Sequence, residues 1–215
     1  MKHCELTLDQ VRDVLTTKGN GRLFSGAHMP IGPDGKCAMC VRELRAVACG
    51  FEWTDTPDGK DFCMTDLICQ GINDGPWSNY EARTSGAIVL ALLSEHTAPE
   101  GWFDAFHKSV VQQILPIAFR AALNEIKGDL YMDAKDAIDR CETEGTADAA
   151  RKAAWLFADT TAVGITRGIE WFDATIENTI TRTALLADDR DAVLRLAVKL
   201  LLTSHGREDL IPHVK

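Results

Sequence analysis

Apolar residues recur along this chain at the spacing of an α-helix. Near its beginning, Leu8, Val11, Val14 and Leu15 fall on one face of a helix. Apart from a brief stretch at residues 22–24, apolar and polar residues do not alternate over the length of a strand. The pattern therefore predicts an all-α protein, a multi-helix bundle of roughly eight or nine helices.

Capping signals mark the beginning of two of these helices. Thr7 followed by Gln10 forms a capping box, and Ser78 followed by Glu81 forms a second one. We expect the second helix to continue to about Glu95. Its central stretch, SGAIVLALL, is apolar on every side, which predicts a buried helix in the middle of the fold.

The same periodicity predicts seven further helical segments. They are expected at residues 38–49, 65–72, 101–127, 129–143, 147–164, 165–187 and 188–206. Pro116 should break or kink the segment that contains it, because proline lacks the amide hydrogen that a helix needs. The tail at 207–215 is expected to be irregular. We divide the chain into an N-terminal helical region, residues 1–97, and a C-terminal helical bundle, residues 98–215, packed together as one globular unit.

Composition narrows the classes of function. The chain has 215 residues, of which 46% are apolar, so it can bury a full core. A formal net charge of -9 argues against nucleic acid as a partner. No apolar run is long enough to cross a membrane, and the first residues lack the apolar core of a signal peptide. We therefore expect a cytoplasmic protein with no membrane partner.

Seven cysteines raise the question of a metal site. Cys37 and Cys40 form a C-x-x-C pair, to which Cys63 and His28 could add ligands for zinc. The spacing is irregular, however, and no glycine lies inside the pair. An odd number of cysteines favours a reduced protein with mostly buried free thiols, and no cofactor is predicted. The alternatives are zinc or another divalent metal, or a nucleophilic Cys37 or Cys40 near a helix start.

A set of polar residues forms the candidate chemical site. Its members are Glu43, Asp55, Asn73, Asp74 and Arg83. Glu43 lies on the inward face of its helix, so it needs a partner such as Arg42 or Arg83. One interpretation is a structural network. The other is a site in which Glu43, Asp55 and Asp74, with Arg83, hold a metal or act as acid and base.

Four carboxylates follow one stripe of a predicted helix. They are Glu125, Asp129, Asp133 and Asp136, at helical spacing. A metal site would need further ligands from a facing helix, so we interpret the stripe as a solvated face.

Part of this chain resembles a pattern found in hypothetical bacterial and phage proteins. Those proteins read approximately C-x-M-E, an Ala-Gly ending, S-D-x-P-x-C, a helix, N-D and a later arginine. The matching residues here are Cys40, Glu43, Gly50, Thr54, Asp55, Pro57, Cys63, Asn73, Asp74 and Arg83. The resemblance covers residues 37–95 and departs from the pattern at Trp53 and by an insertion before Cys63. It implies one structural unit and carries no catalytic role.

Two hypotheses about function follow. The first is a cytoplasmic, phage-encoded helical protein that acts through protein–protein contacts, because no catalytic motif of recognisable specificity is present. The alternative is a small-molecule or metal-dependent enzyme with a carboxylate site around Glu43, Asp55 and Asp74.

Overall fold

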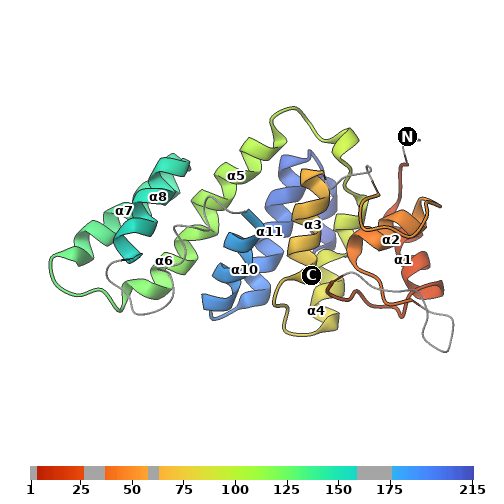
Figure 1. Cartoon of the computed structure of the whole chain (residues 1–215), viewed down its shortest axis with the longest axis horizontal. Coiled ribbons are helices and arrows are strands. Elements are labelled where there is room, and N and C mark those ends of the chain that lie inside the picture. The colour runs from red at the N-terminus through yellow and green to blue at the C-terminus, as the bar shows by residue number, and fades with distance from the viewer. Residues whose placement is uncertain (1–3, 27–36, 58–62, 159–175) are drawn as a thin grey trace.

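The computed structural model describes residues 4–26, 37–57, 63–158 and 176–215, and in this part of the chain it is all-α. Ten α-helices and three short 3₁₀ helices are present there, and the predicted fold class is confirmed (Figure 1). Their bounds are α1 Leu8–Thr17, α2 Val41–Ala48, α3 Met64–Asp74, α4 Tyr80–Ala87, η1 Ile88–Leu92, η2 Glu95–Thr97, α5 Trp102–Gln113, α6 Leu115–Leu123, α7 Leu130–Glu144, α8 Ala147–Ala158, α10 Ile176–Leu186, α11 Arg190–Ser204 and η4 Glu208–His213. No described helix has the length and hydropathy that crossing a bilayer requires.

Local signals locate the first helix correctly and the start of α4 only approximately. The Thr7–Gln10 capping box is formed as predicted. At α4, however, the cap is Asn79, whose side chain accepts a hydrogen bond from the amide of Ala82. Ser78 instead donates its amide to Asp191 of α11, at 2.8 Å. Ser78, which the sequence pattern predicts as the cap, therefore forms a tertiary contact with α11 instead.

The predicted long buried helix from Ser78 to Glu95 is wrong in one respect. α4 ends at Ala87, and the chain continues as the 3₁₀ helix η1 and an extended Leu93. The stretch 88–93 is buried, as expected for its apolar sequence. Where the α-helix changes to a 3₁₀ helix, some backbone carbonyls have no hydrogen-bond donor within the helix. These carbonyls accept hydrogen bonds from the polar network described below.

Pro116 has the effect predicted for it. The helix breaks at Ile114, and Pro116 lies in the first turn of α6, where its missing amide costs no hydrogen bond. The tail was expected to be irregular, but it forms the 3₁₀ helix η4, which buries Leu210.

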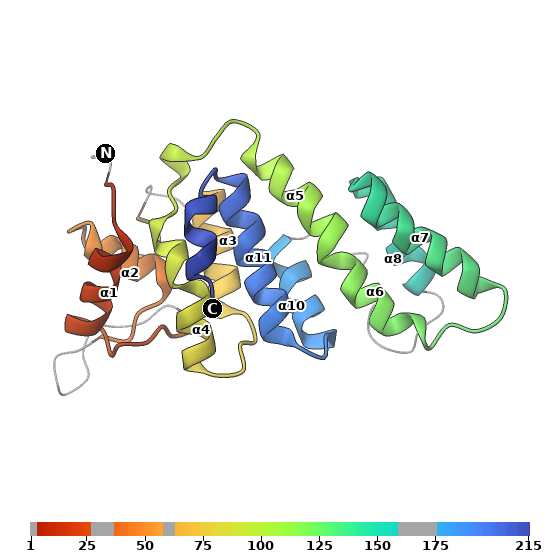
Figure 2. The ribbon, with the colours of Figure 1, turned by 180° about the vertical axis from the view of Figure 1, so that it is seen from behind.

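Buried apolar side chains form two clusters. The larger cluster joins α1–α4 and η1 to the first half of α5 and to α10 and α11. The smaller one joins the end of α5 to α6, α7 and α8, which lie at the far end of the elongated molecule from α1 and α2 (Figures 1 and 2). α10 and α11 therefore pack with helices of the region predicted as N-terminal. The division of the chain into two helical regions at residue 97 remains a prediction.

One pair of cysteines is oxidised, whereas the sequence favoured a reduced protein with mostly buried free thiols. Cys4 and Cys49 form a disulfide that ties the segment before α1 to the end of α2. Arg45 also donates a hydrogen bond to the carbonyl of Cys4, at 3.5 Å. The free thiols of the described residues belong to Cys37, Cys40, Cys63, Cys69 and Cys141, of which Cys37 and Cys63 are only half-buried.

Removing this disulfide is expected to lower the free energy of unfolding by roughly 2–4 kcal/mol, because the crosslink closes a long loop in the unfolded chain. The paired residues are 45 positions apart. Urea denaturation of a Cys4→Ser/Cys49→Ser variant, compared with wild type with and without reductant, measures the effect. A Cys37→Ser variant should keep the sensitivity to reductant. Seven reactive thiols in the unreduced, denatured protein would contradict the disulfide.

Candidate functional site

Glu43 is buried at the start of α2 and has two defined donors. Its Oε2 accepts a hydrogen bond from the amide of Cys40 at 2.7 Å, and its Oε1 accepts one from Nε1 of Trp53 at 3.1 Å. Cys40 is the N-cap of α2, so Glu43 closes a capping box in which a thiol replaces the usual hydroxyl. The carboxylate thus fixes the first turn of α2 and the loop that follows the helix.

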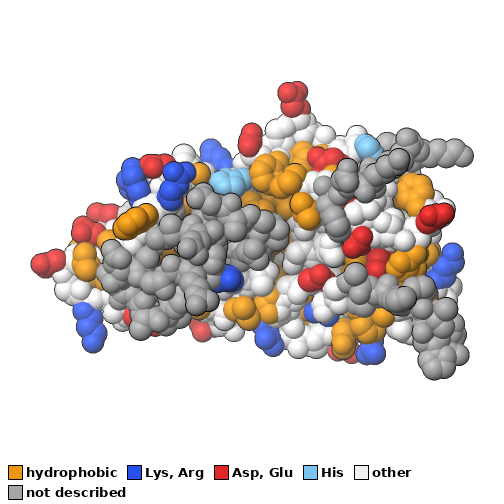
Figure 3. All heavy atoms as spheres, in the orientation of Figure 1, with side chains coloured by type: hydrophobic (Ala, Val, Ile, Leu, Met, Phe, Trp, Pro, Cys, Tyr) orange, Lys and Arg blue, Asp and Glu red, His pale blue; other side chains and the backbone are white. Residues whose placement is uncertain are grey.

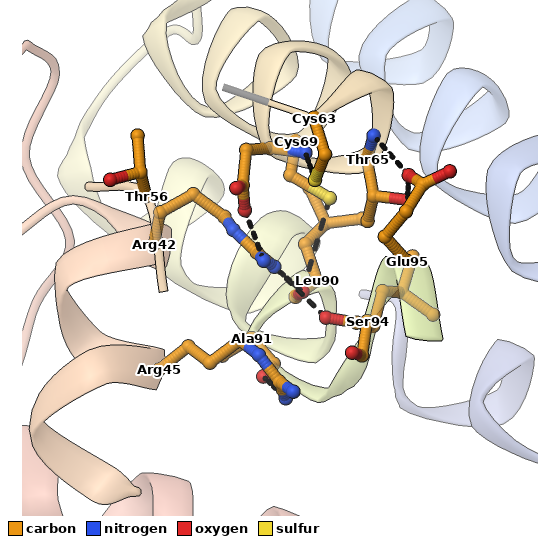
Figure 4. A network of polar contacts seen from close by, with 12 residues as sticks. Arg42, Arg45, Thr56, Cys63, Thr65, Cys69, Leu90, Ala91, Ser94 and Glu95 are labelled. Carbon is orange, nitrogen blue, oxygen red and sulfur yellow. Dashed lines mark hydrogen bonds and ion pairs between the residues drawn. The ribbon is translucent and has the colours of Figure 1, made fainter. Parts of the chain in front are cut away.

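The neighbouring Arg42 pairs with a residue that the sequence did not single out. Its guanidinium forms an ion pair with Asp66 of α3, and both side chains are fully buried. Arg42 also donates to the carbonyls of Leu90 and Leu93, at 3.4 and 3.0 Å. Figure 4 shows this guanidinium between α3 and the turn of chain that includes Leu90 and Ser94.

A second buried arginine binds the same turn of η1. Arg45, 2% exposed, donates to the carbonyl of Ala91 at 3.2 Å, and the thiol of Cys69 contacts the carbonyl of Leu90 at 4.0 Å. The positive charges lie where the 3₁₀ helix ends, and a helix C-terminus carries partial negative charge. α2 is therefore docked on η1 through charge-assisted hydrogen bonds as well as apolar packing.

Asp74 and Arg83 belong to a separate contact at the end of α3. Asp74 accepts hydrogen bonds from the amide of Gly26 at 2.7 Å and from the Asn73 side chain at 2.8 Å. Arg83 donates from Nε to the carbonyl of Asn73 at 2.9 Å, so it does not serve as the partner of Glu43. Asn73 also donates to the carbonyl of Phe24, at 2.7 Å. These contacts hold the segment before α2 against α3.

A third polar group escaped sequence reasoning entirely. The hydroxyl of Thr65 donates to Oε2 of Glu95 at 2.6 Å and lies 3.1 Å from Nε2 of His205. Because the single hydroxyl hydrogen goes to Glu95, Nε2 must donate to Thr65. Nδ1 lies 3.0 Å from the carbonyl of Leu201, which can only accept. Both ring nitrogens of His205 thus contact polar groups, close to the Glu95 carboxylate.

The electrostatics of Glu95 agree with this arrangement. Burial alone raises the pKa of the Glu95 carboxyl, but hydrogen bonds from Thr65 and from the indole of Trp102 outweigh it and lower the pKa. The Trp102 ring also packs against His205 in a tilted arrangement, with centroids 4.2 Å apart. The group joins α3, η2, α5 and α11, and His205 borders a pocket of about 430 Å³.

The thiols of the motif are poor nucleophiles. Burial and the neighbouring Glu43 carboxylate raise the pKa of the Cys40 thiol to about 12. Burial also raises the pKa of Cys63 to about 12. A thiol must ionise to attack a substrate or bind a metal, so neither residue has the environment of a reactive cysteine. Among the described residues, no group of three or more His, Cys, Asp and Glu side chains is arranged to hold a metal ion. His28 lies outside those residues.

A chemical site formed by the four candidate catalytic residues remains a prediction, and their described contacts differ. Glu43 and Asp74 bind different donors, and Asp55, half-buried in the loop after α2, forms no hydrogen bond to either of them. None of the three carboxylates lines the 430 Å³ pocket or a second pocket of about 340 Å³, and neither does Arg83. The structure thus gives Glu43, Asp74 and Arg83 positions in a network that joins segments.

Comparisons of this chain with protein-family models, with curated proteins and with solved structures gave no match. The function must therefore be argued from the site and the surface alone.

Proposed function

We propose that this protein acts through protein–protein contacts and that it binds a basic, amphipathic segment of a partner at the start of α7. One observation carries the proposal. Three consecutive large apolar side chains, Leu130, Tyr131 and Met132, are 43%, 41% and 57% exposed. Exposed apolar groups gathered in this way are typical of contact surfaces.

Charge defines the kind of partner. Four exposed carboxylates flank the three apolar residues in the sequence, and none of the four forms an ion pair with a described residue. They are Glu125, Asp129, Asp133 and Asp136. The prediction that all four follow one stripe of a helix is wrong, because Glu125 and Asp129 lie in the connection between α6 and α7. Lys127 and Lys135 are the basic residues of the same stretch, so its formal charge is negative. We call these seven apolar and acidic residues the tip surface.

The position of the tip surface suits a contact role. α7 lies at the end of the molecule opposite α1 and α2, beyond the connection made by α5 and α6 (Figure 2). Figure 3 shows hydrophobic side chains next to acidic ones at this end. A partner helix with lysines beside a row of leucines would bury the apolar side chains and neutralise the carboxylates, a common mode of peptide recognition.

The biological setting is part of the proposal. The resemblance to phage and bacterial sequences in residues 37–95 supports a phage-encoded protein. Five free thiols among the described residues support a reducing compartment such as the cytoplasm. Disulfides are rare there, so we expect the Cys4–Cys49 bond to exchange with cellular thiols.

A synthetic Leu–Lys peptide of about five helical turns is a suitable probe. In amide NMR spectra, its addition should shift the signals of residues 124–136. A Tyr131→Ser/Met132→Ser variant should bind it at least about tenfold more weakly, because two apolar side chains no longer become buried. A Leu185→Ser variant is the matched control, since Leu185 is 61% exposed on α10.

Three results would contradict the proposal. The first is an absence of shifts in residues 124–136. The second is an equal loss of binding in the Leu185→Ser variant. The third is a dimer in sedimentation that dissociates when Tyr131 and Met132 are replaced, which would make a second copy of this chain the occupant of the tip surface.

A further inference from the structure

A pocket of about 340 Å³ lies far from the tip surface, where four segments of the chain meet. Its walls come from α1, the turn at residues 21–22, α4 and the stretch at residues 213–215. The last of these stretches lies beside α4 (Figure 1), and the amide of Lys215 donates to the carbonyl of Ser85 at 3.3 Å. Its volume is in the range of sites that hold small molecules.

The charge of this pocket is opposite to that of the molecule. Three permanent cations line it, from Arg12, Arg22 and Lys215, and His213 is a fourth basic group. Glu81 has the one side-chain carboxylate among the lining residues. The side chains that line the pocket therefore sum to two positive charges, or three with His213 protonated, in a chain whose formal net charge is -9. Such a local reversal attracts anions and raises their concentration at the pocket.

Arg22 is held in place without being neutralised. Its guanidinium lies 4.7 Å from the centre of the Tyr80 ring and 5.3 Å from that of Phe24. It forms no ion pair with any described residue. Arg12 has only a distant contact with Asp9, at 3.7 Å, and that carboxylate is 95% exposed. A stacked guanidinium with free donors is well suited to a phosphate group, which it can bind through two parallel hydrogen bonds.

The rest of the pocket defines the body of the ligand. Leu15 and Ile88 line it, and both are almost completely buried. The Thr84 hydroxyl is occupied by the amide of Leu23, at 2.8 Å, and by the carbonyl of Tyr80, at 2.7 Å. It therefore joins the turn to α4 and is not available as a free donor. The ligand needs one compact anionic group and an apolar portion.

We propose that this pocket binds a small organic phosphate monoester, with the phosphate at Arg12, Arg22 and Lys215 and an apolar group against Leu15 and Ile88. The proposal does not depend on the tip surface, because the two sites share no residue. A nucleic acid fits poorly, since the positive charge is confined to one small pocket of an acidic chain.

Phenyl phosphate is the probe, with benzyl alcohol as its uncharged counterpart. Calorimetric titration should show phenyl phosphate binding, and amide NMR should place it at residues 21–22 and 84–85. Arg22→Gln should weaken binding about tenfold, the effect of losing hydrogen bonds from one charged group. Glu81→Gln should strengthen binding, because it removes the repelling carboxylate.

Arg120→Gln is the matched control for charge, since Arg120 is exposed on α6 and paired with Glu142. It should leave phenyl phosphate binding unchanged, and thermal unfolding should show that all three variants are folded. Equal weakening by Arg22→Gln and Arg120→Gln would overturn the proposal. Equal binding of benzyl alcohol, or no shift at residues 21–22 and 84–85, would also overturn it.

Discussion

Replacing Asp66 with alanine should lower the free energy of unfolding by about 3–5 kcal/mol, the usual effect of removing one member of a buried ion pair. Arg42 and Asp66 are both fully buried, so the variant would leave a guanidinium in the interior without its carboxylate. Its hydrogen bonds to the carbonyls of Leu90 and Leu93 cannot neutralise the charge. Urea denaturation followed by circular dichroism measures the loss.

A surface ion pair provides the control for this experiment. Arg120 and Asp139 form an ion pair at 3.8 Å and are about half exposed. Asp139→Ala should change the free energy of unfolding by less than about 1 kcal/mol, because water screens exposed pairs. If the two variants lost similar amounts of unfolding free energy, the Arg42–Asp66 pair would stabilise the fold no more than an exposed ion pair does.

Replacing Glu43 with alanine should destabilise the protein by about 3 kcal/mol or more, because a buried amide and a half-buried indole lose their acceptor at once. The amide of Cys40 would remain at the start of α2 without its cap, and the indole of Trp53 would lose Oε1 of Glu43 as an acceptor. The midpoint and slope of urea denaturation give the change directly.

The Glu43→Gln variant keeps the size of the side chain and removes its charge. The amide oxygen of glutamine can still accept one of the two hydrogen bonds, so this variant should lose less stability than Glu43→Ala. If Glu43→Ala were as stable as wild type or more stable, the carboxylate would have the signature of a chemical site, where residues are often kept at a cost in stability.

Sequence reasoning located the helices because their signals are local. The Thr7–Gln10 capping box and the break near Pro116 both depend on residues within one or two turns of each other. The burial of Glu43 was also predicted from spacing, but α2 is buried all round from Val41 to Ala46, which spacing did not indicate. These features are fixed by the backbone geometry of a helix, whatever surrounds it.

The network was less predictable because its contacts join distant parts of the chain. The Thr65 hydroxyl meets His205, which lies 140 residues further on. Arg42 was recognised as a possible partner for a buried charge, but Asp66 reads from sequence as an ordinary first-turn acid of α3. Only the packing of α2 against α3 brings the two side chains together.

The change from α4 to η1 shows a further limit. An apolar run does not reveal whether its carbonyls are satisfied within a helix or by other segments. Here Arg42 and Arg45 supply donors to Leu90, Ala91 and Leu93, which allows the helix to end inside the core. The two arginines could have been noted as unusual on an inward-facing helix, and that signal would have pointed to buried acceptors.

Within residues 37–95, Glu43, Arg42 and Asp66 are buried and hold contacts of the fold. Arg42 and Asp74 each join segments that are distant in sequence, and Glu43 joins the start of α2 to the loop after it. The two binding sites that we propose lie elsewhere, at the start of α7 and in the basic pocket. Binding measurements should therefore respond to changes in Tyr131, Met132 and Arg22, and stability measurements to changes in the motif.

The most direct test of this assignment is a double-mutant cycle on Arg42 and Asp66, with unfolding measured in urea for Arg42→Met, Asp66→Ala and the double variant. If the buried pair holds α2 and α3 together, the double variant should lose about 2 kcal/mol less than the sum of the single losses, or a larger difference still. A coupling near zero, with both single variants close to wild type in stability, would contradict the account.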